Sequence, residues 1–469
     1  MRKTKIVATL GPATDSPEML GKLLDAGMNV ARLNMSHAPH DWVRRVVKDL
    51  RFAAAQRQRS LAILLDTQGP AIRTGDLPVA LDLQPGQKFT LTVRGEKSEE
   101  LHSVDVNYEE FVNDINVGDV VLLDNGEIHM KVLAKFANKV ECEVLTPGKL
   151  GSRRHINLPG VRVSLPALTA KDFADIQVGL EVGVDFIALS FVREARDIQQ
   201  LRAVVENAAH RPLLIAKIED QQAVANLDAI VAVADGIMVA RGDLGIECPY
   251  EDLPLIQRRI VKTCLRVGKP VIVATHMAES MIENPMPTRA EISDIANAVF
   301  EQADAIMLSG ETTVGKHPVQ CVQVFDRIAR RIERSGAPAS SVRADLATPR
   351  QKLVKSAVVL AEDLEAEAIL VFTIRGNMAR QTASFRPFHS RVFAICEHAT
   401  IAQSLSLNWG IESWVMPFPF LHDKPEQNIE DALKHMAKEG LLQVGSQVVI
   451  ISSITAGDQI VDVVEMRVV

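Results

Sequence analysis

The sequence predicts an α/β protein: a (β/α)8 barrel interrupted by a small β domain and followed by an open α/β domain. From Lys5 onward, short apolar strands alternate with helical patterns, which is typical of a parallel sheet built from βα units. Between residues 70 and 167 only strand patterns occur, and the alternation resumes at Leu168. A length of 469 residues adds a third observation, because it suggests roughly three domains.

The barrel strands are predicted by apolar runs that end in polar residues. In the second run, Val30, Arg32 and Asn34 share one face. Ala31 and Leu33 share the other face. An apolar face toward outer helices and an inner face that becomes polar toward the strand end is what a barrel strand requires. The eight predicted strands are Lys5–Gly11, Met28–Ser36, Leu61–Asp66, Asp185–Phe191, Leu213–Glu219, Gly236–Gly242, Pro270–His276 and Ala305–Ser309.

Capping residues mark the helices between these strands. Asp15 or Ser16 is the predicted N-cap of the first helix, and Pro17 suits its first turn. Gly27 follows the predicted end of this helix. A longer helix is predicted from about residue 41 to residue 57.

The two other domains are predicted from the remaining strands. In the insertion, Asp124-Asn125-Gly126 is a hairpin signal between two apolar runs. A polar, proline-containing linker near 335–350 precedes four further apolar strands, at Ala368–Phe372, Arg391–Ile395, Ser413–Met416 and Ser446–Ser452. The predicted boundaries are 1–69 and 168–346 for the barrel, 70–167 for the insertion and 347–469 for the C-terminal domain.

Composition narrows the class of protein. A net charge of −7 gives no global basic field, which argues against a nucleic-acid partner. The five cysteines are scattered, which favours a reducing compartment over a disulfide framework. The N-terminus enters a strand without a signal-peptide pattern, and no apolar run approaches the ~20 residues of a membrane span. We therefore expect a cytoplasmic protein with no membrane partner.

The predicted strand ends carry the residues that suggest chemistry, since catalytic groups of such barrels lie at this end. Glu219 and Asp243 offer hard oxygen ligands suited to Mg2+ or Mn2+. Basic side chains in the same region can neutralise phosphate charges, namely Arg32, Arg73, Lys217 and Arg241. This combination favours phosphoryl transfer, which needs positioning and charge stabilisation. A lone polar residue at a strand end, such as Thr275, is more often a helix cap.

Seven stretches, in order along the whole chain, together resemble the pyruvate kinase family. They are Thr4–Thr14, Ala31–His37, Leu65–Arg73, Ile156–Gly160, Ala216–Glu219, Met238–Gly245 and Asn284–Glu291. The resemblance is to a bacterial-type, three-domain member without an N-terminal extension. It implies transfer of the phosphoryl group of phosphoenolpyruvate to ADP, giving pyruvate and ATP. It also implies that the insertion is a small β-barrel lid and that the C-terminal domain is regulatory.

The resemblance implies roles for individual residues. The catalytic residues would be Arg32, Lys217 and Thr275, and the substrate would also contact Arg241, Gly242 and Asp243. Mg2+ (or Mn2+) would be held by Glu219 and Asp243. K+ would be held by Asn34, Ser36, Asp66 and Thr67. The nucleotide would contact Asn34, His37, Arg73 and Arg154.

Regulation and assembly are also implied by the resemblance. A sugar-phosphate or nucleotide effector would bind at Thr373, Arg375, Asn377, Arg380 and Ser453, and the protein would be a homotetramer. Among the departures from the family pattern, two bear on K+ use and on pH dependence. Ala71 stands where a glutamate accompanies K+ use, and His276 replaces the usual glutamine, which predicts a changed pH dependence near the protonation step.

Two other functions are compatible with parts of the sequence. A Mg2+-dependent 2-oxo-acid aldolase would use the same barrel and the same pair of carboxylates. A metabolite sensor would use the C-terminal domain on a barrel without activity. The insertion and the several arginines argue against the aldolase, and the complete set of polar strand ends argues against the sensor.

Overall fold

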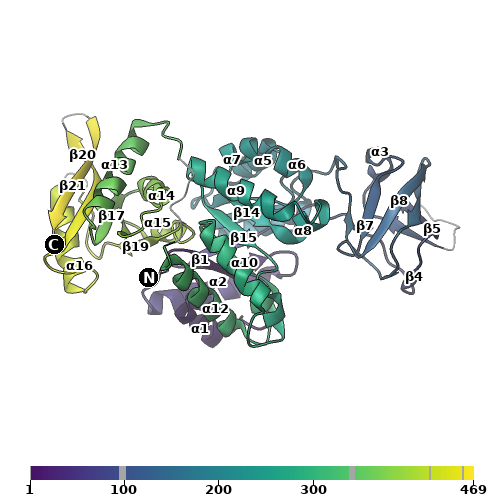
Figure 1. The fold of residues 1–469 in the computed structure, drawn as a ribbon, viewed down its shortest axis with the longest axis horizontal. Helices are drawn as coiled ribbons and strands as arrows, with labels where there is room; N and C mark the ends of the chain where they lie inside the picture. The colour runs from purple at the N-terminus through teal and green to yellow at the C-terminus, as the bar shows by residue number, and fades with distance from the viewer. Residues whose placement is uncertain (1, 94–101, 337–343, 422–423, 457–458) are drawn as a thin grey trace.

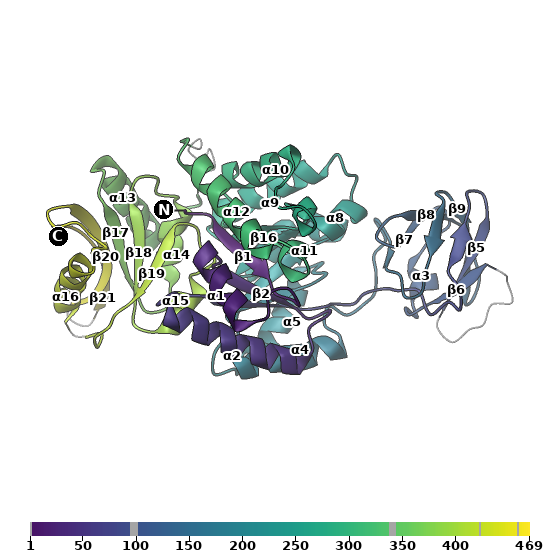
Figure 2. The ribbon, with the colours of Figure 1, turned by 90° about the horizontal axis from the view of Figure 1, so that it is seen from below.

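The structure is a computed structural model that describes residues 2–93, 102–336, 344–421, 424–456 and 459–469. The barrel lies in the centre of an elongated molecule, with the inserted domain at one end and the C-terminal domain at the other (Figure 1). Seen from below, two extended segments connect the barrel to the inserted domain (Figure 2). Part of the predicted linker, 337–343, lies outside the described residues.

Eight parallel strands close into a barrel in the order β1-β16-β15-β14-β13-β12-β3-β2, which confirms the predicted fold class. The strands are β1 (Lys5–Thr9), β2 (Val30–Asn34), β3 (Ala62–Asp66), β12 (Phe186–Leu189), β13 (Leu213–Ile218), β14 (Gly236–Ala240), β15 (Val271–Ala274) and β16 (Ala305–Leu308). The helices of this part are α1 (Pro17–Ala26), α2 (His40–Gln56), α4 (Ala170–Val182), α5 (Ala195–Val205), α6 (Gln221–Ala225), α7 (Leu227–Val233), α8 (Arg241–Glu247), α9 (Leu253–Val267), η1 (Glu279–Ile282), α10 (Arg289–Phe300), α11 (Gly310–Thr313) and α12 (Pro318–Glu333).

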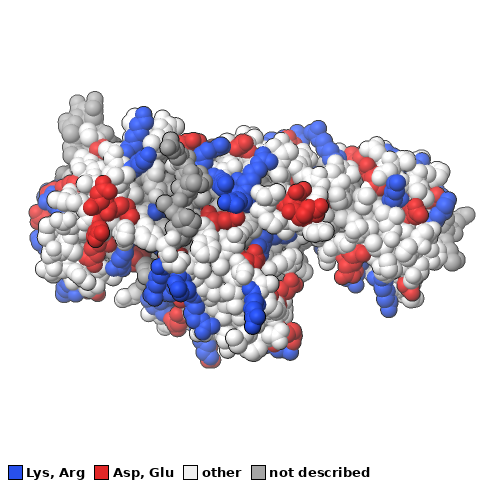
Figure 3. Space-filling view, in the orientation of Figure 1, with Lys and Arg blue, Asp and Glu red and all other residues white. Residues whose placement is uncertain are grey.

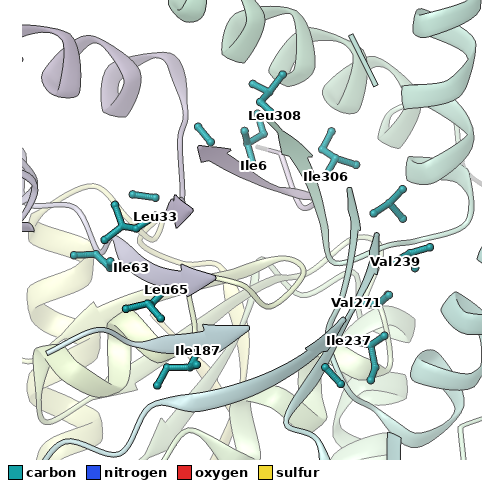
Figure 4. Close-up of a cluster of buried hydrophobic side chains, with 14 of the residues drawn as sticks. Ile6, Leu33, Ile63, Leu65, Ile187, Ile237, Val239, Val271, Ile306 and Leu308 are labelled. Atoms are coloured by element: carbon teal, nitrogen blue, oxygen red, sulfur yellow. The ribbon is translucent and has the colours of Figure 1, made fainter. Parts of the chain in front are cut away.

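Side chains of the barrel strands alternate between two buried clusters. Ile6 and Leu33 belong to the cluster that also contains helix residues, and Figure 4 shows these strand side chains on the outside of the strands. Val7 and Val30 belong to the second cluster, formed by the neighbouring strand positions inside the barrel. The alternation predicted from the second strand is therefore observed.

The helix caps explain where the first helix begins and ends. Ser16 is the N-cap of α1, and its hydroxyl accepts a hydrogen bond from the Met19 N–H at 3.3 Å. Asp15 instead accepts a bond from the Trp42 indole at 3.0 Å. Gly27 ends α1 with φ of 116°, a left-handed conformation that glycine adopts most readily.

The inserted domain contains a six-stranded sheet, β11-β7-β8-β9-β5-β6, and a two-stranded sheet, β10-β4. We expected a small β-barrel, and the described residues form these two sheets. Asp124 and Asn125 have φ of 53° and 57° in the turn between β7 and β8, as the hairpin signal predicts. The elements are β4 (Leu81–Leu83), β5 (Lys88–Val93), β6 (Ser103–Val106), α3 (Phe111–Asp114), β7 (Val120–Leu123), β8 (Ile128–Lys135), β9 (Lys139–Val144), β10 (Gly148–Leu150) and β11 (Ile156–Asn157).

The C-terminal domain has one strand more than predicted. Its sheet has the order β19-β18-β17-β20-β21, and β21 is antiparallel to β20. The missed strand is interrupted by the charged residues Asp462, Glu465 and Arg467, so it lacks the unbroken apolar run by which its neighbours were found. The elements are α13 (Pro349–Asp363), β17 (Ala368–Thr373), α14 (Asn377–Ser384), β18 (Arg391–Cys396), α15 (Ala399–Ser404), β19 (Ile411–Val415), α16 (Pro425–Lys438), β20 (Gln447–Ala456) and β21 (Gln459–Val468).

The surface carries charges of both signs. Acidic and basic side chains are interspersed over the face drawn in Figure 3. Among the described helices, none combines the length and apolar character that a membrane-spanning segment requires.

Candidate active site

A polar cavity of about 380 Å³ lies where the C-terminal ends of the barrel strands meet the inserted domain. The predicted barrel residues that line it are Arg32, Asn34, Ser36, Thr67, Lys217, Glu219 and Asp243. Arg73 and Arg154 line it from the inserted domain. A larger cavity of about 580 Å³ also lies between the barrel and the inserted domain, and its lining includes Leu158, Asp220 and Glu247. We place the site in the smaller cavity because it contains the lysine, the arginines and the paired carboxylates.

Lys217, on β13, is the central positive charge of the cavity. Its Nζ lies 2.9 Å from Glu219 Oε1 and 3.1 Å from Asp66 Oδ1. It also donates a hydrogen bond to Ser190 Oγ at 2.7 Å. Burial by itself lowers the pKa of this ammonium group, but the two carboxylates outweigh burial and raise the pKa. Lys217 is therefore a fixed positive charge at the cavity wall.

Glu219 and Asp243 form the pair of carboxylates predicted to hold a metal. Burial raises the pKa of Glu219 to about 7; Lys217 opposes this shift and Asp243 adds to it. The Phe191 N–H donates to Glu219 Oε2 at 2.6 Å and orients the carboxylate. Two carboxylates that repel each other in a polar cavity are chemically suited to a hard divalent cation.

The number of carboxylates also bears on the metal. Within the ranges that the structure describes, no three His, Cys, Asp or Glu side chains gather as a metal cluster. A pair of carboxylates fits Mg2+, which keeps several water or substrate oxygens in its shell. The residues present therefore fit the predicted cation.

Arg32 belongs to the same ionised network. Its Nε donates to Asp66 Oδ2 at 2.6 Å, and its Nη1 donates to Thr9 Oγ1 at 3.0 Å. Burial by itself raises the pKa of Asp66, but Lys217 and Arg32 together lower it below its usual value. One buried carboxylate thus pairs with both buried cations, Arg32 and Lys217.

The four residues expected to bind K+ lie together at the ends of β2 and β3. Asn34 is paired with Asp66 in the parallel register. The Ser36 N–H donates to Asn34 Oδ1 at 3.2 Å, and Thr67 Oγ1 accepts from the Ser190 N–H at 3.1 Å. The structure thus brings together hydroxyl, amide and carboxylate oxygens.

The chain makes a strained turn where β15 ends. Thr275 and His276 have φ of 67° and 55°, a left-handed conformation that costs a non-glycine residue on the order of 1–3 kcal/mol. The turn brings Thr275 Oγ1 to 2.8 Å from the Gly242 N–H, which donates to it. His276 itself is exposed. The predicted substrate-binding residues Gly242 and Thr275 are therefore in direct contact.

The side chain of Arg241 differs from the expectation. Its guanidinium donates to the Thr275 carbonyl oxygen, from Nε at 3.1 Å and from Nη2 at 2.5 Å. Its Nη1 donates to Asp294 Oδ1 at 2.8 Å, and Arg241 does not line the polar cavity. The strand passes directly into α8 at this residue, which directs its side chain toward β15 and α10. The expectation that this guanidinium neutralises phosphate is therefore wrong.

The residues expected to bind the nucleotide are more exposed. Arg73 donates to the Arg153 carbonyl oxygen at 3.1 Å, and Arg154 lies 3.3 Å from Asp124 Oδ1. His37 is exposed and is not among the residues that line the cavity. The structure thus brings Arg73, Arg154 and Asn34 to one cavity but not His37.

Several residues of the cavity were missed from sequence, and three of them bear on its charged groups. Ser190 accepts the bond from Lys217, and Phe191 orients Glu219 through its backbone. His155 lies in the wall; its burial lowers the pKa of its imidazole, and Asp243 opposes that shift. Ser190 could have been found, because it ends an apolar strand as the other site residues do.

The predicted effector residues lie near the C-terminal ends of the neighbouring strands β17 and β20 and at the start of α14. Thr373 Oγ1 accepts from the Gly376 N–H at 3.0 Å, just before α14. Arg380 donates to Asn377 Oδ1 at 3.2 Å, whereas Arg375 is exposed. Ser453, on β20, donates to Asp462 Oδ1 at 2.8 Å. The structure therefore groups the α14 residues and leaves Ser453 beside a carboxylate.

The comparisons with known proteins agree with one another. The family model "Pyruvate kinase, barrel domain" matches residues 1–322, and "Pyruvate kinase, alpha/beta domain" matches residues 351–464. Pyruvate kinase of Geobacillus stearothermophilus is 40% identical over 470 residues, which cover 97% of this chain and 78% of that protein. Plastidial pyruvate kinase 2 of Arabidopsis thaliana is 41% identical over 457 residues, which cover 96% and 78%. A crystal structure of a pyruvate kinase from Cryptosporidium parvum is 34% identical, with a TM-score of 0.92 and coverage of 98% and 96%.

Fold and cavity define the class: a (β/α)8-barrel enzyme with a charged cavity under an inserted β domain. The two family models, which match residues 1–322 and 351–464, narrow this class to one family. The chain belongs to the pyruvate kinase family, and its enzymatic class is that of a phosphotransferase.

Proposed function

We propose that this chain transfers the phosphoryl group of phosphoenolpyruvate to ADP, giving pyruvate and ATP. The observation that carries the proposal is the position of Lys217 Nζ between Glu219 and Asp66 in the wall of the polar cavity. Phosphoryl transfer depends on fixed positive charge and positioning more than on covalent chemistry. Family membership supports the same reaction.

Lys217 and Arg32 hold the transferring group in this proposal. Both cations are anchored through Asp66, so neither needs to reorganise as the ADP oxygen bonds to phosphorus and negative charge develops on the enolate oxygen of the leaving pyruvate. The Gly242 N–H, near the start of α8, exchanges its bond to Thr275 Oγ1 for one to the substrate carboxylate, which it binds together with the backbone of Arg241. The Thr275 hydroxyl lies beside the methylene carbon and takes part in its protonation.

Glu219 and Asp243 would hold Mg2+ or Mn2+, with the remaining positions left to water and substrate oxygens. When bound, the cation neutralises phosphate charge and orients the substrate. Asn34, Ser36, Asp66 and Thr67 would hold K+. Ala71 lines the same cavity and adds no charged ligand. The requirement for K+ is therefore tested separately from that for Mg2+.

ADP is proposed to bind at Asn34, Arg73 and Arg154, with His37 at the margin. Arg73 and Arg154 belong to the inserted domain, so movement of this domain toward the barrel would deliver positive charge to the phosphates and exclude water. The boundaries 1–69 with 168–346, 70–167 and 347–469 are proposed as the units that move relative to one another.

A homotetramer is proposed for the assembled protein. β21 is the last strand of its sheet among the described residues, and Val461, Met466 and Val468 on it are 40%, 49% and 61% exposed. An edge strand with exposed apolar side chains favours pairing with another chain.

Regulation by a sugar phosphate or nucleotide is proposed at Thr373, Arg375, Asn377, Arg380 and Ser453. A cytoplasmic location is proposed because all five cysteines are buried free thiols.

The reaction is tested by measuring pyruvate formation from phosphoenolpyruvate with and without ADP. We expect pyruvate only when ADP is present, and an equal amount of ATP. Lys217→Met is expected to lower kcat by about a thousand-fold, which is the order of effect of removing a positive charge from a phosphoryl-transfer site. Formation of pyruvate without ADP from a 4-hydroxy-2-oxo acid would instead support the aldolase. An unchanged rate in the Lys217 variant would disprove the proposed role of Lys217.

Whether each cation is required is tested in the same assay. Removal of divalent cations with a chelator is expected to abolish turnover, and titration with Mg2+ or Mn2+ to restore it. Rates with and without K+ at constant ionic strength decide whether the site of Asn34 and Thr67 uses a monovalent cation. A panel of sugar phosphates and nucleotides at sub-saturating phosphoenolpyruvate tests for the effector.

A further inference from the structure

We propose that Arg241 is a positioning residue: its guanidinium fixes the Thr275–His276 turn, and through that turn it fixes the Thr275 hydroxyl and the Gly242 N–H. This inference rests on the proposed function, because those two groups matter only if substrate binds beside them. It assigns a role to a charged residue that does not line the polar cavity.

The contacts of Arg241 account for nearly all of its donors. Nε donates to the carbonyl oxygens of Ala274 and Thr275 at 3.2 and 3.1 Å, and Nη2 donates to Thr275 at 2.5 Å. Nη1 donates to Asp294 Oδ1 at 2.8 Å and to Gln257 Oε1 at 3.4 Å. The residue is only 8% exposed, so the bonds are shielded from water. A guanidinium engaged in this way keeps a single Nη2 N–H without an acceptor, and it does not line the cavity in which a phosphate would bind.

The turn that it holds requires such support. Thr275 and His276 are consecutive non-glycine residues with φ of 67° and 55°. Residues persist in this conformation only where the surrounding structure holds them there. Three donor contacts from one side chain reach the two carbonyl groups at the start of the turn.

The same turn is held from its other side by the next residue of the chain. The Gly242 N–H donates to Thr275 Oγ1 at 2.8 Å, and Thr275 Oγ1 donates to the Ala274 carbonyl oxygen at 2.7 Å. Arg241 and Gly242 therefore hold Thr275 through its carbonyl and its hydroxyl at once. Loss of the guanidinium frees the carbonyl and lets the hydroxyl move.

The outer end of the guanidinium is itself anchored. Asp294 belongs to α10 and Gln257 belongs to α9. Gln257 Nε2 donates in turn to Glu301 Oε2 at 2.9 Å, which joins α9 to the end of α10. The strand end, the short helix α8 and the two outer helices are thus connected through one side chain.

A matched control exists at the opposite end of the barrel. Arg51 donates to the carbonyl oxygens of Leu61 and Gly183 at 2.7 and 3.0 Å, and to Asp185 Oδ2 at 2.8 Å. These acceptors precede β3 and β12, so they lie at the N-terminal ends of the strands. Arg51→Met removes the same kinds of bond as Arg241→Met but leaves the cavity intact.

Kinetics of these variants test the inference. Arg241→Met is expected to lower kcat ten- to a hundred-fold, whereas Arg51→Met changes it less than two-fold. Arg241→Lys keeps the charge but has a single donor nitrogen, so it should remain within three-fold of Arg241→Met. Full activity of Arg241→Lys would mean that charge, not geometry, is what matters, and would overturn the inference.

A double variant shows whether Arg241 acts through Thr275. Arg241→Met in a Thr275→Ala background should change kcat less than three-fold, because the group that it positions is already gone. If the double variant instead loses kcat by the product of the two single effects, Arg241 acts independently of Thr275, and the inference is overturned. Exchange of the methyl hydrogens of pyruvate with deuterated solvent, which reports the protonation step, should fall in parallel with kcat.

A measurement without turnover separates this inference from the proposed function. Backbone hydrogen exchange in the segment 271–278 should accelerate at least ten-fold in Arg241→Met and less than two-fold in Arg51→Met. A wild-type protein that makes no ATP from phosphoenolpyruvate would disprove the proposed function, and hydrogen exchange would still decide the role of Arg241. Unchanged exchange in Arg241→Met would overturn the inference even in an active enzyme.

Discussion

Replacement of Asp66 by Asn tests the ionised network beneath the cavity. Asp66 is fully buried, accepts a bond from Arg32 at 2.6 Å and lies 3.1 Å from Lys217. The amide has almost the same shape but no charge, so two buried cations lose a shared counter-charge. Removing one partner of a buried ion pair costs about 3–5 kcal/mol, and we expect a loss of this size in the free energy of unfolding.

The sign of the pH dependence follows from the pKa of Asp66. Lys217 and Arg32 outweigh burial and lower this pKa, so the carboxylate stabilises the fold above its unfolded pKa of about 3.9. That contribution is lost as the pH falls through the lower, folded pKa. The difference in stability between wild type and Asp66→Asn should therefore be complete at pH 7 and decrease below a pH of about 4.

Asp185→Asn is the matched control for this change. Asp185 is also buried and lies 2.8 Å from Arg51, but its pKa is raised by burial because a single arginine compensates only partly. The fold thus disfavours its charge, and loss of that charge should cost less than about 1.5 kcal/mol. Urea unfolding of both variants at pH 7 gives the comparison. Equal losses in the two variants, or a loss below about 1 kcal/mol for Asp66→Asn, would refute the reasoning.

Three further predictions concern the metal pair, the edge strand and a helix cap. Burial, with Asp243 adding to it, raises the pKa of Glu219 to about 7, so in metal-free protein the Mg2+ affinity should fall about ten-fold per pH unit below 7 and level off above it. Calorimetry in buffers of different ionisation enthalpy should detect the released proton, and an affinity independent of pH between 6 and 8 would contradict this. Met466→Asp on β21 should reduce the oligomer in analytical ultracentrifugation at unchanged circular dichroism, whereas an unaltered assembly would show that this edge is not an interface. Gly27→Ala should destabilise the protein by about 1 kcal/mol, because φ is 116° at the end of α1; no loss in thermal unfolding would contradict this.

The barrel and much of the site were predictable because parallel strands expose their carboxyl ends on one side. Any polar residue that ends an apolar run of such a sheet must lie near the others. Lys217, Glu219 and Asp243 were found in this way, and the cavity contains all three. Periodicity also predicted which face of the second strand enters the barrel, as Val30 and Leu33 show.

Side-chain direction was not predictable where a strand changes into a helix. Arg241 and Gly242 are adjacent, yet the first extends under β15 while the second reaches Thr275 through its backbone. Sequence spacing gives position along the chain but not the torsion angles at such a junction. The expectation that the Arg241 guanidinium neutralises phosphate was therefore wrong. The role of Ser190 as an acceptor for Lys217 was missed.

The sequence by itself determined the alternation of strands and helices, the closure of the barrel and the family. These features depend on local patterns of apolar residues and on motifs that are read one segment at a time. Only the tertiary structure decided which charges are shared, because Asp66, Lys217 and Arg32 come from three different strands. It also decided that Arg241 supports the turn at Thr275 instead of facing the cavity, since that contact joins residues 34 positions apart.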